Sequence, residues 1–217
     1  MRKVAPAVLL AAVFGLAGCV APPSFGPTQP AAPAPPAAPA PAAAPGPAGP
    51  ITGFTGDLRT LLLPRPSGAA NAADPKSDGT ITIQQAAASF SDANQGLTQL
   101  KALGFQRGAF EQWREPDGTQ VSVIVFQFGD HPSATTFTYG AQRSYGLDRA
   151  FDAPIGIPGV PLGNAYQLSA PGQDKQWLTE VFFTRNNMTA ELSITGPTKL
   201  PAARAVSMAQ SQYGLLP

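Results

Sequence analysis

The stretch TQVSVIVFQF, residues 119–128, decides the fold of this chain. Its apolar side chains occupy almost every position and leave almost no polar face: Val121, Val123, Ile124, Val125, Phe126 and Phe128. Successive side chains of a strand point to opposite faces, so a strand of this composition must be covered on both sides. The stretch therefore predicts a central strand of a buried sheet.

Two hairpins are predicted around this strand. Residues 105–114 form the preceding strand, and Asp117-Gly118 is typical of the tight turn between two antiparallel strands. A second pair follows at residues 177–184 and 188–195, with Asn186-Asn187 as its turn. Both hairpins indicate an antiparallel sheet.

A helix is predicted after each hairpin, from Asp130 to about Tyr145 and from about Pro201 to Tyr213. The two helices end in similar sequences, AQRSYG at residues 141–146 and AQSQYG at residues 209–214. The similarity indicates either a duplication or a chance resemblance between two helix ends rich in Ala and Gln. This order predicts an α+β fold, with one antiparallel sheet built from two hairpin-plus-helix units. We expect the helices to pack on one face of the sheet, giving two layers.

The segment before the first hairpin has its own local signals. Leucines at residues 58–63 predict a short lead-in strand or helix that the Pro-rich residues 64–68 end. Thr82 and Gln85 have the spacing of a capping box and predict a helix start. A second helical piece carries Leu97, Leu100 and Leu103 on one face and ends at Gly104.

The N-terminus has the parts of an export signal. Arg2 and Lys3 precede an apolar run, and Leu16-Ala17-Gly18-Cys19 ends it with the only cysteine of the chain. Two alternatives are a transmembrane anchor and a buried structural cysteine. The run at residues 4–18 falls short of the roughly 20 residues that span a bilayer, which favours a cleaved signal.

Leu16, Ala17, Gly18 and Cys19 resemble a bacterial lipobox. The resemblance implies cleavage before Cys19 and attachment of a lipid, with acyl chains such as palmitate, to its thiol. It also implies a lipoprotein anchored in the cell membrane and facing the extracytoplasmic side. The predicted organisation is a signal peptide at 1–18, a lipidated cysteine and tether at 19–50, and one extracytoplasmic domain at 51–217.

Residues 20–50 predict the tether, because they are nearly all Ala, Pro and Gly and carry no charge. Proline-rich chains adopt extended polyproline II at about 3.1 Å per residue, so the tether can reach roughly 100 Å. It is either an inert spacer or a segment that cell-wall polymer surrounds. The chain resembles secreted lipoproteins of high-GC Gram-positive bacteria. The resemblance rests on the lipobox, the tether and residues 104–109, which lead into the first hairpin. PsbP-like folds in some such lipoproteins imply similar layering.

Composition excludes several function classes. The chain has 14 basic and 13 acidic residues, and loss of Arg2 and Lys3 with the signal peptide leaves a net charge of −1. Nucleic-acid binding needs an excess of basic residues, so this function is not expected. One cysteine allows no disulfide framework, and one histidine allows no ordinary metal site, so we expect no cofactor. His131 lies between Asp130 and Pro132, a context typical of a helix start.

Three glutamates remain as candidates for chemistry. Glu111, Glu180 and Glu191 lie on the predicted hairpins, and a glycosidase needs only two carboxylates. On strands that alternate between core and solvent, however, glutamates mark the solvated face. We therefore expect no catalysis and keep a cell-wall hydrolase with a carboxylate pair as the alternative.

The candidate ligand-binding residues centre on residues 151–163, a stretch rich in Pro, Gly and apolar side chains. This loop either packs as a crossover between the two units or covers a hydrophobic site. Two tryptophans on the hairpins could complete such a site, whose candidates are Trp113, Ile155, Ile157, Val160, Leu162 and Trp177. The predicted function is a non-catalytic binding or accessory module for an envelope protein, a cell-wall component or an apolar ligand.

Overall fold

The computed structural model of this protein describes residues 53–72 and 79–217. The predicted signal peptide, the lipobox with Cys19 and the tether lie outside the described residues. The elements of the described part are, in chain order, η1 (Leu58–Leu61), β1 (Ala70–Asn71), β2 (Thr80–Ile81), α1 (Ile83–Ala87), α2 (Ala93–Ala102), β3 (Phe105–Arg114), β4 (Gln120–Phe128), α3 (His131–Leu147), β5 (Ile155–Gly156), β6 (Asn164–Gln167), β7 (Trp177–Arg185), β8 (Met188–Gly196) and α4 (Ala202–Leu215).

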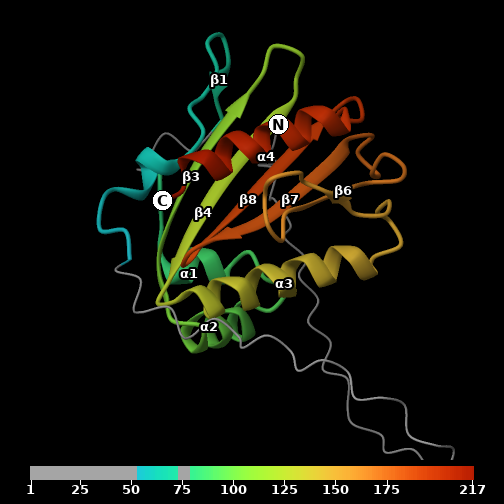
Figure 1. Cartoon of the computed structure of the whole chain (residues 1–217). Helices are drawn as coiled ribbons and strands as arrows, with labels where there is room; N and C mark the ends of the chain where they lie inside the picture. The colour runs from blue at the N-terminus through green and yellow to red at the C-terminus, as the bar shows by residue number, and fades with distance from the viewer. Residues whose placement is uncertain (1–52, 73–78) are drawn as a thin grey trace, which may run out of the picture. The chain divides into compact units, whose positions relative to one another are not determined.

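The strands form one antiparallel sheet with the order β1-β3-β4-β8-β7-β6-β5, and β2 also pairs with β3 (Figure 1). Strand β4 lies between β3 and β8, where it pairs with its hairpin partner on one side and with the second hairpin on the other. The predicted α+β class and the two hairpin-plus-helix units, β3-β4-α3 and β7-β8-α4, are confirmed.

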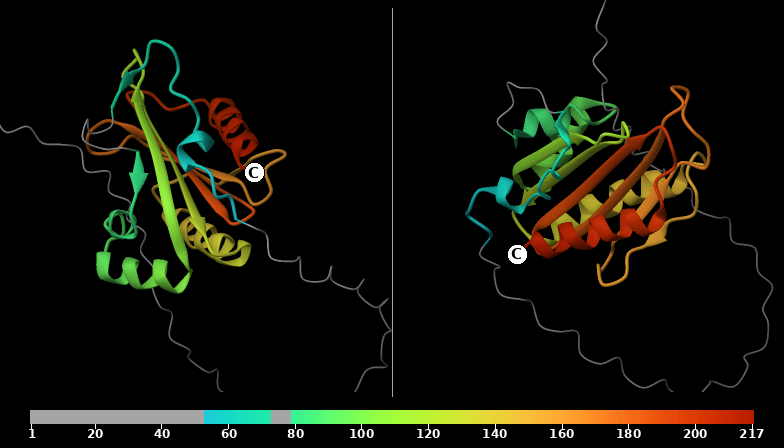
Figure 2. Two further views of the ribbon diagram at one scale, coloured as in Figure 1. Left: turned by 90° about the vertical axis from the view of Figure 1, so that its left-hand side faces the viewer. Right: turned by 90° about the horizontal axis from the view of Figure 1, so that it is seen from above.

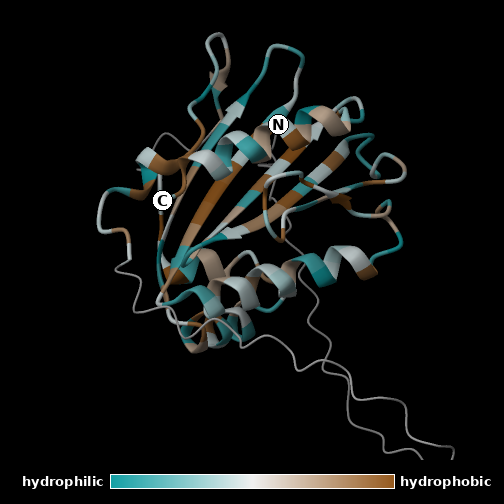
Figure 3. Cartoon of the chain, viewed as in Figure 1, coloured by the Kyte–Doolittle hydropathy of each residue, from teal (hydrophilic) through white to brown (hydrophobic). Residues whose placement is uncertain are grey.

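Helices cover both faces of this sheet, so the expectation of one helical layer is wrong. Figure 2 shows α4 and the α1–α2 pair on opposite sides of the strands. Buried residues of α4 pack with Val121, Val123 and Val125 of β4. Phe126 and Phe128, which lie on the other face of β4, pack instead with α1, α2 and the start of α3. Figure 3 shows hydrophobic residues concentrated on the central strands of the sheet. Because β4 is apolar on both faces, each face must be covered.

Local signals predicted from sequence set the ends of these elements. Thr82 and Gln85 form the complete capping box at the start of α1, and the Asp130 side chain accepts a hydrogen bond from the Ser133 amide at the start of α3. Gly118, with φ 89°, and Asn186, with φ 52°, provide the left-handed conformations of the two hairpin turns. The four short strands β1, β2, β5 and β6 were not predicted.

The lead-in before β1 is fastened to the domain at two points. Gln212 of α4 is fully buried; its Nε2 donates to the Leu61 carbonyl at 2.7 Å, and its Oε1 accepts from the Leu63 amide at 2.8 Å. At the other point, Arg107 Nη2 and Gln127 Nε2 both donate to the Phe54 carbonyl. These bonds make the lead-in part of the core face that α4 covers.

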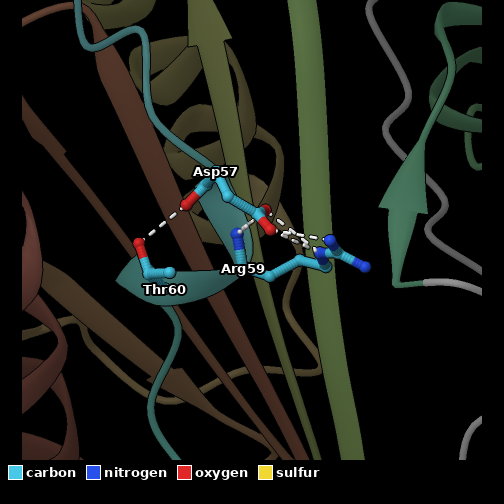
Figure 4. A network of polar contacts seen from close by, with 3 residues as sticks. All are labelled: Asp57, Arg59 and Thr60. Carbon is cyan, nitrogen blue, oxygen red and sulfur yellow. Dashed lines mark hydrogen bonds and ion pairs between the residues drawn. The ribbon is translucent and has the colours of Figure 1, made fainter.

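Between these points the short helix η1 has its own cap (Figure 4). The Asp57 side chain accepts from the Arg59 amide and pairs with the Arg59 guanidinium, while Thr60 Oγ1 donates to the Asp57 carbonyl. Hydrogen bonds from Arg59 lower the pKa of Asp57 to about 2. The cap fixes one exposed turn so that Leu58 and Leu61 face inward.

The two-sided core generates a stability prediction. Leu192 of β8 is fully buried, so Leu192→Ala should lower the free energy of unfolding by about 2–5 kcal/mol, through lost burial and the cavity left behind. Leu147→Ala removes the same atoms from a side chain that is 71% exposed and should change the free energy of unfolding by no more than about 0.5 kcal/mol. Equal midpoints for the two variants in urea-induced unfolding would contradict this packing.

Candidate functional site

Strand register aligns a polar row across the face of the sheet opposite to α4. Gln112 of β3 pairs with Ser122 of β4, Ser122 with Ser193 of β8, and Ser193 with Glu180 of β7. Glu180 also pairs with Tyr166 of β6. Directly paired residues share a face, so polar side chains from five adjacent strands stand side by side here.

Glu180 and Glu191 form the chemically unusual part of this face. Glu191 pairs with Phe182, so it lies diagonally next to Glu180, and the two side chains are 2% and 1% exposed. Ser193 Oγ donates to Glu180 Oε1 at 2.9 Å. Glu180 Oε2 and Glu191 Oε1 are buried without a hydrogen-bond partner. Buried acceptors without donors are costly, which makes this pair the candidate site.

Burial and mutual repulsion keep this pair from ionising as ordinary carboxyls do. Burial, followed by the charge of Glu191, raises the pKa of Glu180 well above its usual range. Burial also raises the pKa of Glu191 to about 7. Near neutral pH, the buried pair therefore stays partly protonated, whereas two exposed glutamates would both be ionised.

An aromatic cluster borders the carboxyl pair. Tyr145 of α3 lies with its ring centroid 5.1 Å from that of Phe182, 5.9 Å from that of Tyr166 and 5.0 Å from that of Phe151. Burial raises the pKa of the Tyr145 hydroxyl, and the charges of Glu180 and Glu191 and, more weakly, Asp148 raise it further. The phenol of Tyr145 thus remains protonated.

The expectation that the strand glutamates mark a solvated face is wrong for Glu180 and Glu191, because their face of the sheet is covered. Glu111 pairs with Val123, which packs under α4, so it lies on the opposite face. It lines an open cavity of about 600 Å³ with Arg59, Thr60, Leu62, Leu63, Pro64, Arg65 and Leu215. Only two of the three candidate glutamates therefore come together.

The 151–163 loop contributes side chains to the core. Ile157 and Val160 are buried, Ile155 packs against the same cluster, and Leu162 is 41% exposed. Two amide side chains hold the loop: Gln142 Nε2 donates to the Leu162 carbonyl, and Gln210 Nε2 donates to the Pro158 carbonyl. The loop is thereby attached to both α3 and α4.

The two tryptophans occupy different environments. Trp113 is 1% exposed in the core under α4, and its indole Nε1 is buried without a partner. Trp177 is half-buried and lines a cavity of about 150 Å³ at the start of β7, with the Lys199 ammonium 5.3 Å from its ring centroid. None of the 151–163 residues lines that cavity.

The remaining candidates for chemistry offer less. His131 is exposed, and its Nδ1 lies 2.6 Å from the Asn186 carbonyl, which joins the start of α3 to the β7–β8 turn. Within residues 53–72 and 79–217, no group of three or more His, Cys, Asp or Glu side chains is placed to hold a metal ion.

The buried pair predicts a pH-dependent stability. Because burial raises the folded pKa of Glu191 from 4.5 to about 7, the folded state binds more protons than the unfolded chain, and the stability that this group contributes falls as pH rises from about 4.5 to about 7. The raised pKa of Glu180 acts in the same direction. Glu191→Gln should reduce this fall and raise the free energy of unfolding at pH 8 by roughly 1–3 kcal/mol. Urea-induced unfolding at pH 5 to 8 measures both effects.

Glu111→Gln is the matched control, because it makes the same change on the opposite face and should retain the parent's pH dependence. A Glu191→Gln variant with the parent's slope and stability would contradict the assignment of the effect to this pair.

Comparison with known proteins does not identify a family for this chain. No family model matches the sequence, and no curated protein matches it. Among solved structures, the chain is similar to the extracellular domain of PknH from Mycobacterium tuberculosis, with 12% sequence identity and a TM-score of 0.43. The match covers 68% of this chain and 80% of that chain. At this level of similarity, the function of the chain must be inferred from its own residues.

Proposed function

We propose that this protein is a membrane-anchored extracytoplasmic lipoprotein whose folded domain is a non-catalytic binding module. One observation carries the proposal: an apolar N-terminal run ends in Leu16-Ala17-Gly18-Cys19 and is followed by an uncharged Pro- and Ala-rich segment and then by a domain. A signal, a lipidated cysteine and a spacer in this order place a domain outside the membrane. No helix in the described part of the chain is long and apolar enough to cross a membrane.

The geometry of the domain supports binding over hydrolysis. A glycosidase must present one carboxyl group to the leaving-group oxygen and the other to the sugar or to water. Here both carboxyl groups are almost fully buried, and one of them is bonded to Ser193. Glu111, which is more exposed, lies on the opposite face and cannot replace either. The alternative, a cell-wall hydrolase, would need a conformation that uncovers the pair.

Lipidation is tested by expressing the full chain in an actinobacterial host that is fed an alkyne analogue of palmitate. The parent chain should incorporate the label, lose residues 1–18 and fractionate with membranes, because the Cys19 thiol carries the acyl chains. Cys19→Ser should remain unlabelled and uncleaved. Intact mass of the purified chains measures both changes, and an unlabelled parent that retains its N-terminus would overturn the proposal.

Hydrolysis is tested on the mature chain with purified cell wall, by release of reducing sugar ends. We expect no release above that of a Glu180→Gln/Glu191→Gln double variant. Release by the parent that the double variant loses would instead support the carboxylate hydrolase. The double variant should keep the far-ultraviolet circular dichroism of the parent, because both changes are isosteric.

A further inference from the structure

We propose that the cavity of about 150 Å³ at the start of β7 is a binding site for a single sugar ring. This inference rests on the proposed binding role of the domain and names the class of ligand that it takes. Six of the ten residues that line the cavity carry a hydrogen-bonding side chain: Asp117, Thr119, Trp177, Thr179, Thr198 and Arg204.

Segments that are far apart in the sequence build this cavity. Trp177 and Thr179 lie two residues apart on β7, on the face of the sheet that α4 covers. The turn between β3 and β4 contributes Asp117 and Thr119, and the first turn of α4 contributes Arg204. Because strands and a helix position these groups, the cavity exists before any ligand binds.

The volume of the cavity limits the size of its ligand. A cavity of roughly 150 Å³ is large enough to hold a six-membered ring such as benzene. One pyranose ring therefore matches this cavity in size, whereas a long acyl chain or a folded peptide does not.

The lining groups retain unused hydrogen-bonding capacity. Thr179 is 1% exposed, and its Oγ1 accepts from Gln167 Nε2 at 3.1 Å. Within residues 53–72 and 79–217, the O–H of Thr179 donates to no acceptor. Arg204 Nη2 donates to the Glu115 carboxylate, which leaves the Nε and Nη1 donors of Arg204 for a ligand. Buried donors without acceptors are costly, so a ligand that accepts from them is favoured.

The charges of the lining favour a neutral ligand. Asp117 is the one acidic lining residue and Arg204 the one basic lining residue, so the two charges balance. Hydrogen bonds from Thr119 lower the pKa of Asp117, which keeps its carboxylate ionised as an acceptor. The cavity thus offers donors and acceptors without net charge. Hydroxyl groups suit this combination, because each of them both donates and accepts.

Trp177 adds an apolar surface to these polar groups. Its half-buried side chain lines the cavity, and the Lys199 ammonium lies over the indole ring, 5.3 Å from the centroid, while it also pairs with Asp152. The C–H groups of a sugar ring pack against an aromatic surface, and its hydroxyls reach the polar groups around it. The indole therefore favours a sugar over an inorganic ion.

The test uses the mature full-length chain, labelled with nitrogen-15, in micelles of a detergent that has no sugar head group. The probes are D-glucose, D-galactose, D-mannose and N-acetyl-D-glucosamine, and glycerol is the non-cyclic control. The chain has two tryptophans, so two indole N–H signals are followed by nuclear magnetic resonance, and Trp177→Phe assigns them.

We expect at least one sugar to shift the Trp177 signal saturably, with a Kd on the order of 1–10 mM for a ligand of this size. The signal of Trp113, which is 1% exposed in the core and does not line the cavity, should not move. Failure of all four sugars, or an equal shift with glycerol, would overturn the proposal.

Variants then locate the site. Thr179→Val and Thr198→Val should each weaken binding about fivefold, because each removes a lining hydroxyl at nearly constant shape. Thr136→Val makes the same change on the exposed side of α3 and should bind as the parent does. Thr198 is exposed, so its variant should fold even if Thr179→Val does not. Unchanged affinity in the folded cavity variants would overturn the assignment.

Two forms of the bound sugar distinguish its source. Tighter binding of the methyl glycoside than of the free sugar would identify the terminal ring of a glycan chain, and the reverse order would identify a free sugar. Either result supports the site. Failure of all sugars would leave labelling at Cys19 unaffected, so this inference and the proposed lipoprotein can fail separately.

Discussion

The structure depends on one constraint: strand β4 is apolar on both faces, and both faces must be removed from water. A strand of this kind cannot lie at the edge of a sheet or form the wall of a two-layer domain. The chain meets the constraint by placing β4 between its two hairpins and by covering the faces with different helices. Valines 121, 123 and 125 pack under α4, and Phe126 and Phe128 pack against α1, α2 and α3.

The same arrangement explains how two glutamates become buried. On β7 and β8, the residues that alternate with the α4-facing core lie on the second covered face, where α3 packs. Any side chain at these positions leaves water, whatever its polarity. The chain uses them for Thr184, Thr189, Glu180, Glu191 and Ser193, and the threonine hydroxyls bond to Thr138 of α3. The threonines find partners within the fold, whereas the glutamates are only partly satisfied.

The sequence was sufficient to predict the long elements, because their signals are local. The Asp117-Gly118 turn, the capping box at Thr82 and the Asp130 cap each depend on residues within a few positions of one another. Short edge strands such as β1 and β5 lack such signals, since two residues carry no periodicity. Cover on both faces of the central strand was predicted, but the helices that cover the second face were not, and Glu180 and Glu191 were wrongly assigned to a solvated face.

Part of the candidate site was nevertheless accessible from the sequence. A two-residue turn at Asn186-Asn187 fixes the hairpin register, and that register places Glu180, Glu191 and Ser193 on one face. The contribution of Tyr145 and Tyr166 could not be predicted, because it depends on where α3 and β6 dock. Those positions follow from long-range packing, for which one sequence without relatives offers no signal.

Hydrogen bonds hold residues 54–63 to the domain, so the folding unit begins before the first strand. A fragment that starts at the first strand, at residue 70, would leave the buried Gln212 amide and the Gln127 amide without the carbonyls that they bond. It would also expose the hydrophobic surface that Leu58, Leu61 and Leu62 cover. The smallest autonomously folding fragment therefore includes Phe54, and a protease that cuts inside the lead-in would loosen the domain as well as separate it from the proposed lipid anchor.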